Sequence, residues 1–212
     1  MVEPGLGRRA AAEFIGTAFL TLCIVGSGIS AARLTPGDPG FQLVFNALAT
    51  GLGLAALIVV LGAISGAQFN PAITLVAWLT EETPRRTALA YVGAQFAGAA
   101  AGVLFANAIF GLEAFQRSDQ TRASAGLWVS EAIATLGLVL VIFGLARSGR
   151  RALVPFAVGS YITAAILSTS STAFANPRRH SREACPTPSR ASHQVRLGCS
   201  LSRNSSAPSW DS

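Results

Sequence analysis

The stretch Ser65-Gly66-Ala67-Gln68-Phe69-Asn70-Pro71-Ala72 decides the fold, because a similar stretch, Ser171-Thr172-Ala173-Phe174-Ala175-Asn176-Pro177, stands at the matching point of a second apolar half. Asn is a preferred helix cap, and Pro is preferred at the first helical position. Each Asn-Pro pair therefore predicts a helix start at the end of an apolar span. From Arg178 onward the sequence changes character, so no apolar helix pattern follows the second start.

The composition is typical of a membrane protein. Hydrophobic residues make up 51% and charged residues 12% of the 212 residues, against about 25% charged residues in globular proteins. The mean hydropathy is +0.49. Stretches of about 20 mostly apolar residues cross a bilayer as helices. We expect an all-α membrane protein with a half-helix over 70–80 and five spans, at roughly 11–32, 42–64, 88–111, 125–146 and 152–170.

The charges orient these spans. The net charge is +6, but residues 178–212 hold six Arg against two acids, so the basic excess does not indicate a nucleic-acid partner. With a cytoplasmic N-terminus the positive-inside rule is obeyed. The outer loops then carry Arg33, Arg117 and Arg122, and the inner loops carry Arg8, Arg9, Arg85, Arg86, Arg147, Arg150 and Arg151. The three Cys show no metal-ligand spacing, so no metal site or cofactor is expected.

The two halves align as a repeat. Residues 11–17 match residues 129–135, and each segment opens a span with one acid, Glu13 or Glu131, near its start. Each is followed by a second span and then by an Asn-Pro pair. With three spans to a half, the second half enters the membrane from the opposite side, which predicts an inverted repeat. In such folds half-helices point their positive N-termini at the midplane.

These residues resemble the major intrinsic protein family, the aquaporins and aquaglyceroporins. The resemblance covers residues 8–177, and its carriers are residues 12–17, 65–72, 130–131 and 175–177. Residues 46–51, 161–165 and 171–177 look most like bacterial members found near arsenic-resistance genes. Two positions depart from the family pattern: Gln68 stands where His is usual, and Arg178 replaces the Ala of the second Asn-Pro-Ala. The resemblance implies a homotetramer in the bacterial inner membrane.

The resemblance assigns roles to the repeated residues. Asn70 and Asn176, followed by Pro71-Ala72 and Pro177, cap the two half-helices and turn their amides into a pore. There they replace hydrogen bonds that a permeant loses, while the helix dipoles oppose cations. Simple capping is the alternative role. Glu13 and Glu131 are buried acids that hydrogen-bond the loops carrying the half-helices; a proton relay is the alternative.

The family's selectivity constriction uses four positions, which fall on Thr50, Ala164, Ala173 and Arg179. Water-selective members usually have bulky Phe and His at the first two. Here three positions are small, which favours uncharged solutes larger than water. Arg179 matches the family literally, but that match is accidental if the tail is out of frame.

Residues 178–212 are expected to form a disordered basic tail, outside an incomplete channel domain of residues 1–177. A charged Arg-Arg-His run at the first turn of a membrane helix is costly. When residues 178–184 are back-translated with GC-rich codons and one nucleotide after the Pro177 codon is skipped, the shifted frame can encode Ala-Val-Thr-Leu-Ala-Arg. This restores the form of residues 70–74, with Val most plausible in place of Arg179. We therefore expect one extra nucleotide after the Pro177 codon, and no sixth span in the chain as written.

The expected function is a passive channel without catalysis, for water, glycerol-like polyols and metalloid acids such as arsenous acid. A non-functional truncated polypeptide is the first alternative. A secondary transporter is the second, since inverted repeats also serve transporters. The spans show no cluster of polar residues suited to an ion-coupled site.

Overall fold

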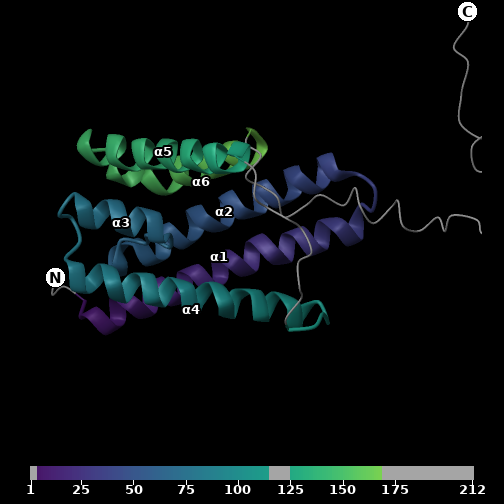
Figure 1. Ribbon diagram of the computed structural model, residues 1–212, viewed down its shortest axis with the longest axis horizontal. Coiled ribbons are helices and arrows are strands. Elements are labelled where there is room, and N and C mark those ends of the chain that lie inside the picture. Colours follow the sequence, from purple (N-terminus) through teal and green to yellow (C-terminus); the bar gives the residue numbers. More distant parts are fainter. Residues whose placement is uncertain (1–3, 115–124, 169–212) are drawn as a thin grey trace, which may run out of the picture. The chain divides into compact units, whose positions relative to one another are not determined.

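The computed structural model describes residues 4–114 and 125–168, all within one compact unit, Met1–Asn176. The described residues form helices without strands (Figure 1). Five of these helices are long and apolar enough to cross a membrane. The elements are α1 (Leu6–Leu34), α2 (Pro39–Ser65), α3 (Pro71–Leu79), α4 (Arg85–Ile109), α5 (Ala125–Arg147), the short 3₁₀ helix η1 (Arg151–Leu153) and α6 (Val154–Ser168).

The prediction of an all-α membrane fold with five spans and one half-helix is confirmed. Helices α1 and α2 extend past the predicted spans at both ends, whereas α4 ends before the predicted residue 111 and α6 begins after the predicted residue 152. Helix α1 begins at Leu6, and Arg8 and Arg9 lie in its first turns. This extension has a simple cause, because the prediction counted apolar residues only. A helix continues beyond the hydrocarbon into the headgroup region, where Arg side chains reach water. The tail of residues 178–212 lies outside the described residues.

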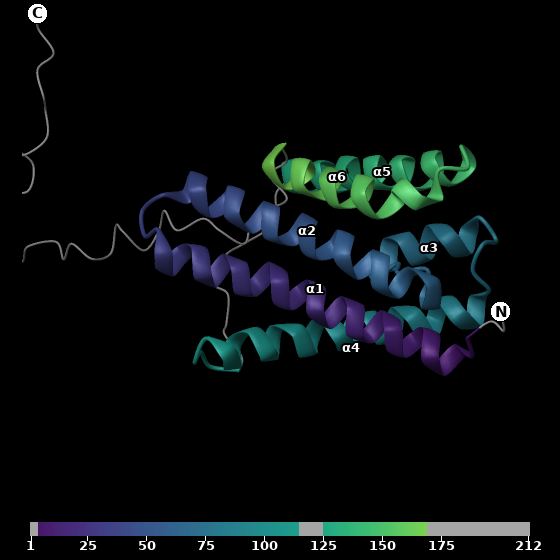
Figure 2. The same ribbon diagram turned by 180° about the vertical axis from the view of Figure 1, so that it is seen from behind.

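Helix α3 is the half-helix. After α2 the chain turns back, and α3 then runs toward the end of the molecule where α4 begins (Figures 1 and 2). Nine residues at ~1.5 Å each give about 14 Å, roughly half of a 30 Å hydrocarbon core. The Asn70 side chain caps the helix by accepting from the Ala72 amide at 2.8 Å, and Pro71 occupies the first helical position. The helix start that the sequence pattern predicts is therefore present in the structure.

Close glycine contacts join the spans in pairs. Gly98 and Gly102 of α4 lie so near α1 that a Cβ added at either would collide with a carbonyl oxygen, that of Phe14 or Ala18. Between α2 and α6, Gly51 and Gly159 meet in the same way. Small residues let helix backbones approach closely in membranes, where burial of apolar surface does not drive association. Further contacts join α1 to α2, α5 to α6, and α3 to both α4 and α5.

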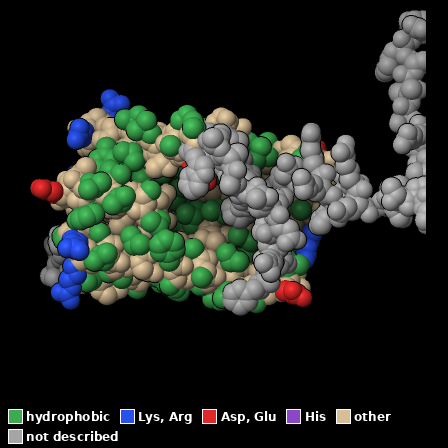
Figure 3. Space-filling model, viewed as in Figure 1, with side chains coloured by type: hydrophobic (Ala, Val, Ile, Leu, Met, Phe, Trp, Pro, Cys, Tyr) green, Lys and Arg blue, Asp and Glu red, His purple; other side chains and the backbone are tan. Residues whose placement is uncertain are grey.

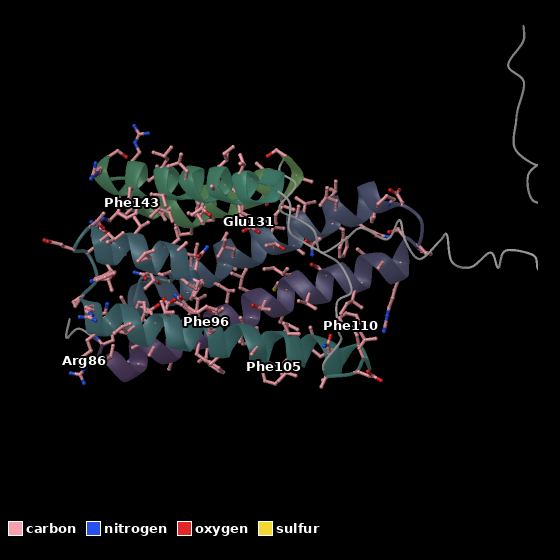
Figure 4. All side chains as sticks on the ribbon, in the orientation of Figure 1. Arg86, Phe96, Phe105, Phe110, Glu131 and Phe143 are labelled. Atoms are coloured by element: carbon pink, nitrogen blue, oxygen red, sulfur yellow. The ribbon has the colours of Figure 1, made fainter. Side chains whose placement is uncertain are left out.

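Polar and apolar side chains divide along the helix axes. Hydrophobic side chains cover the flank, and charged ones gather at the two ends (Figure 3). Large apolar residues such as Phe96 and Phe105 of α4 point outward and are more than half exposed (Figure 4). Lipid would cover this surface in a membrane. Seven of the eight described Arg lie at the end where α1 and α4 begin and where α5 connects to α6; Arg33 lies at the other end.

Candidate functional site: a cavity beside the half-helix

A cavity of about 760 Å³ lies among α1, α2, α3, α5 and α6. Asn70 is part of its wall, together with the loop of residues 65–69. Most of the remaining wall is apolar, formed by Leu20, Ile24, Leu54, Ile58, Ile73, Leu138, Ile142, Val158 and Ile162. Arg9, Gln68, Glu82, Thr83 and Arg151 also line it, and all of these except Gln68 lie at the Arg-rich end. One polar edge therefore faces an extended apolar wall.

Asn70 uses only part of its amide for capping. Its Oδ1 accepts from Ala72, and its Nδ2 makes no hydrogen bond to any described residue. In the first turn of α3, Pro71 has no N–H, and the N–H groups of Ala72 and Thr74 bond to Asn70, so the Ile73 N–H is the backbone donor left without an internal partner. The arrangement offers hydrogen-bond donors and the positive end of a helix dipole at the cavity. Asn70 can therefore cap α3 through its Oδ1 and still offer its Nδ2 as a hydrogen-bond donor.

Glu13 holds the loop that leads to Asn70. Its carboxylate is fully buried, and each oxygen accepts two hydrogen bonds. One oxygen accepts from the Ser65 hydroxyl at 2.6 Å and the Gln68 amide at 3.0 Å; the other accepts from the Phe69 amide at 2.7 Å and from Gln95 at 2.9 Å. All four partners are donors, so the carboxylate satisfies its buried oxygens without an ion pair. This geometry is the one expected for a loop-holding acid.

Glu131 lies in the first turns of α5 (Figure 4). Among the described residues it is exposed and makes no hydrogen bond. The burial of Glu13 depends on the loop folded over it, so the predicted burial of Glu131 stays a prediction. The equivalent loop before Asn176 lies outside the described residues.

The structure describes the positions of two of the four predicted constriction residues. Thr50 lines the cavity and is 3% exposed, and its hydroxyl has no hydrogen-bond partner among the described residues. Ala164 is exposed on α6 and is not part of this cavity wall. Helix α6 instead turns Val158 and Ile162 toward the cavity. Ala173 and Arg179, like the second half-helix residues Asn176 and Pro177, lie outside the described residues.

Several polar residues at the site escaped the sequence analysis. Tyr91 and Gln95 of α4 are almost completely buried and bond to the loop network. Asn46 of α2 donates to the Ile24 carbonyl at 2.7 Å and to Ser27 at 2.9 Å on α1. A signal for the α4 pair was present: positions 91, 95, 98 and 102 recur at helical spacing and carry two polar residues and two glycines. Polar residues within a span merit such attention.

No group of three or more His, Cys, Asp or Glu residues able to hold a metal ion occurs in the described part of the chain. The described site presents hydrogen-bond donors beside a cavity. A half-helix whose N-terminus faces a cavity between membrane-length helices is typical of a channel or transporter.

The comparisons with known proteins identify the family. The sequence pattern described as "Major intrinsic protein" matches residues 2–181. A protein named Aquaglyceroporin AqpS from Rhizobium meliloti is 47% identical over 177 residues, which is 84% of this chain and 75% of that protein. Probable aquaporin AqpM from Archaeoglobus fulgidus is 34% identical over 166 residues, covering 68% of each chain. The solved structure of the aquaglyceroporin from Plasmodium falciparum, 23% identical, superposes with a TM-score of 0.66 over 79% of this chain and 74% of that one.

The chain belongs to the major intrinsic protein family. It is a multi-pass membrane protein of a class of passive channels for water and small solutes, and it is not an enzyme. These predictions from the sequence are confirmed.

Proposed function

We propose that the intact protein is a passive channel for small neutral solutes of glycerol size, with water. One observation carries the proposal: the Asn70 end of α3 opens into a cavity of about 760 Å³ whose remaining wall is largely apolar. A polyol has hydroxyl groups and a hydrocarbon backbone, so it can use a polar edge and an apolar wall together. The similarity to a relative named aquaglyceroporin supports this solute class. Arsenous acid is a small uncharged compound with three hydroxyl groups, which can use the same polar edge.

The width of the constriction is part of the proposal. Thr50, Ala164 and Ala173 are small, and the fourth position is Arg179 as written, or Val in the restored frame. Without a bulky pair the opening admits solutes larger than water. Thr50 lines the cavity, and its buried hydroxyl has no hydrogen-bond partner among the described residues; both observations support its place on the solute path.

We further propose that residues 178–212 are out of frame. The family match ends at residue 181, close to Pro177, which supports this. The coding DNA decides the point: the frame shifted by one nucleotide should encode Ala in place of Arg178 and then a sixth apolar span. A prompt stop codon in that frame would contradict it.

Proteoliposomes test the function. The chain as written should pass water and glycerol poorly, because the second half-helix and the sixth span are missing from its sequence. The frame-restored chain should pass water, glycerol and arsenous acid without saturation and without dependence on an ion gradient. Water flux without solute flux would overturn the solute class. Saturable flux coupled to an ion gradient would favour a secondary transporter, and equal flux through both chains would show that the tail region is unimportant.

A pair of substitutions in the restored chain tests the constriction. Thr50→Phe combined with Ala164→His should suppress glycerol and arsenous acid flux and spare water. Leu52→Phe is the matched control, because Leu52 lies on the same helix, is 70% exposed and is not part of the cavity wall. Unchanged solute flux in the double variant would show that the constriction lies elsewhere.

A membrane orientation and an assembly belong to the same proposal. The Arg-rich end should face the cytoplasm of a bacterial inner membrane, with the N-terminus inside, in accordance with the positive-inside rule. The intact protein should assemble as a homotetramer. Protease accessibility in inside-out vesicles and cross-linking of the restored chain test these two statements separately.

A further inference from the structure

The loop that carries Asn70 adopts an unfavourable backbone. Gly66, Ala67 and Phe69 have φ angles of 87°, 50° and 47°, and two of these residues are not glycine. Non-glycine residues in the left-handed region persist when the surrounding structure holds them there. Glu13 binds the amides of Gln68 and Phe69, and it reaches the start of the loop through the Ser65 hydroxyl, which accepts from the Ala67 amide at 3.1 Å. Two side chains of α4 make further contacts at the loop's entry and at its exit into α3.

Tyr91 fixes the entry. Its side chain has no exposed surface, and its hydroxyl donates to the Ser65 carbonyl at 2.7 Å. The same hydroxyl accepts from the Arg9 Nε at 2.9 Å, and the Arg9 guanidinium lies 5.6 Å from the centre of the ring. Because Arg9 can only donate, the hydroxyl hydrogen is directed at Ser65. A chain of hydrogen bonds thus runs from α1 through α4 to the last residue of α2.

Gln95 fixes the exit. It is 1% exposed, and its Nε2 donates both to Glu13 at 2.9 Å and to the Thr74 hydroxyl at 3.0 Å. Thr74 belongs to the first turn of α3 and bonds through its backbone to Asn70. The Gln95 side-chain amide therefore links Glu13, which holds the loop, to helix α3, which follows the loop. Rotation of α3 about its axis would break at least one of these bonds.

We propose that Tyr91 and Gln95 are positioning residues: they set the direction in which Asn70 and the first turn of α3 face the cavity. Neither residue lines the cavity, so neither touches a permeant there. The functional meaning rests on the proposed channel, because the orientation of Asn70 matters to flux only if solutes pass it. The positioning itself is a property of the chain as it stands.

Hydrogen exchange on the full chain in detergent tests the positioning. Tyr91→Phe removes one hydroxyl and keeps the ring, so the peptide covering 66–70 should exchange about fivefold faster, the factor that corresponds to one typical hydrogen bond. Gln95→Leu, of similar size but without an amide, should accelerate the same peptide further. Peptides of α5 and α6 should keep their exchange rates in both variants. Tyr161→Phe is the matched control, because the second Tyr bonds to the Ala134 carbonyl at 3.0 Å away from the loop.

The possible outcomes are distinguishable. Acceleration confined to 66–70 in the Tyr91 variant, and absent from the Tyr161 variant, supports the proposal. Equal exchange at 66–70 in the Tyr91 variant and the unmodified chain overturns it. Uniform acceleration along the whole chain also overturns it, because that result reports a general loss of stability. If Gln95→Leu fails to fold, the comparison of Tyr91→Phe with the Tyr161→Phe control still tests the proposal. A restored chain that conducts no solute while these exchange results hold would refute the proposed channel and leave the positioning intact.

Discussion

The two acids of the repeat, Glu13 on α1 and Glu131 on α5, stand at matching sequence positions and occupy opposite environments. Glu13 is completely buried and accepts four hydrogen bonds, whereas Glu131 is exposed and bonds to no described residue. The difference teaches that the acid is only half of a structural unit. Its burial depends on a loop that folds over it and supplies amide donors. The residues expected to supply that loop for Glu131 lie outside the described part of the chain, so its burial stays a prediction.

The largest expected effect follows from this contrast. Glu13→Gln replaces one accepting oxygen by an amide NH₂, which faces donors and leaves two of them without partners. Each buried unsatisfied donor costs about 1–3 kcal/mol, so the free energy of unfolding should fall by about 2–5 kcal/mol. Thermal unfolding in detergent, followed by circular dichroism, measures this loss.

Glu131→Gln is the matched control for that experiment. An exposed substitution away from special contacts changes stability by no more than about 0.5 kcal/mol. Equal losses for the two acids would mean that Glu131 is buried in the membrane-embedded protein and that the contrast is wrong.

A smaller effect separates the helix pairs of the two halves. Gly98→Ala on α4 would place a Cβ against the Phe14 carbonyl, so it should destabilise the protein by about 1–3 kcal/mol through overpacking. Gly144→Ala on α5 meets nothing within 4 Å and should stabilise by about 0.5–1 kcal/mol, because Ala favours the helix. Unfolding midpoints of the two variants should therefore move in opposite directions. A loss for both would show that Gly144 also has a close neighbour in the membrane.

The smallest effect compares two buried threonines. Thr74 accepts a hydrogen bond from Gln95, so Thr74→Val should cost about 1 kcal/mol. The hydroxyl of Thr50 has no partner among the described residues, so Thr50→Val should be neutral or slightly stabilising in the empty protein. In the restored chain the same Thr50 change should reduce glycerol flux if the hydroxyl faces the solute. A marked loss of stability from Thr50→Val would indicate a partner that the described residues lack.

The spans, the half-helix and the position of Glu13 could be predicted from the sequence because each rests on a local or repeated signal, whereas the role of Glu13 came from the family resemblance. Apolar length gives the spans, Asn70-Pro71 gives the helix start, and the repeat marks the acid. The contributions of Tyr91 and Gln95 could not be predicted in this way. They depend on which face of α4 meets α1, and that face is set by glycine contacts between residues about 80 positions apart in the chain.

The environment of Glu131 could not be predicted from the repeat alone. A sequence repeat predicts equal environments only when both copies include every segment that buries the acid. The first copy supplies the loop of residues 65–70, and the corresponding residues before Asn176 lead directly into the altered sequence at Arg178. Periodicity within α5 marks the position of the acid but contains no information on what covers it.

The most direct test of the two-half architecture repeats the Glu131→Gln substitution in the frame-restored chain. If the second half forms its own loop and half-helix, Glu131 becomes the counterpart of Glu13. The unfolding midpoint of the restored chain should then fall by an amount similar to that caused by Glu13→Gln. A restored chain whose midpoint is as insensitive to Glu131→Gln as that of the chain as written would contradict the equivalence of the two acids.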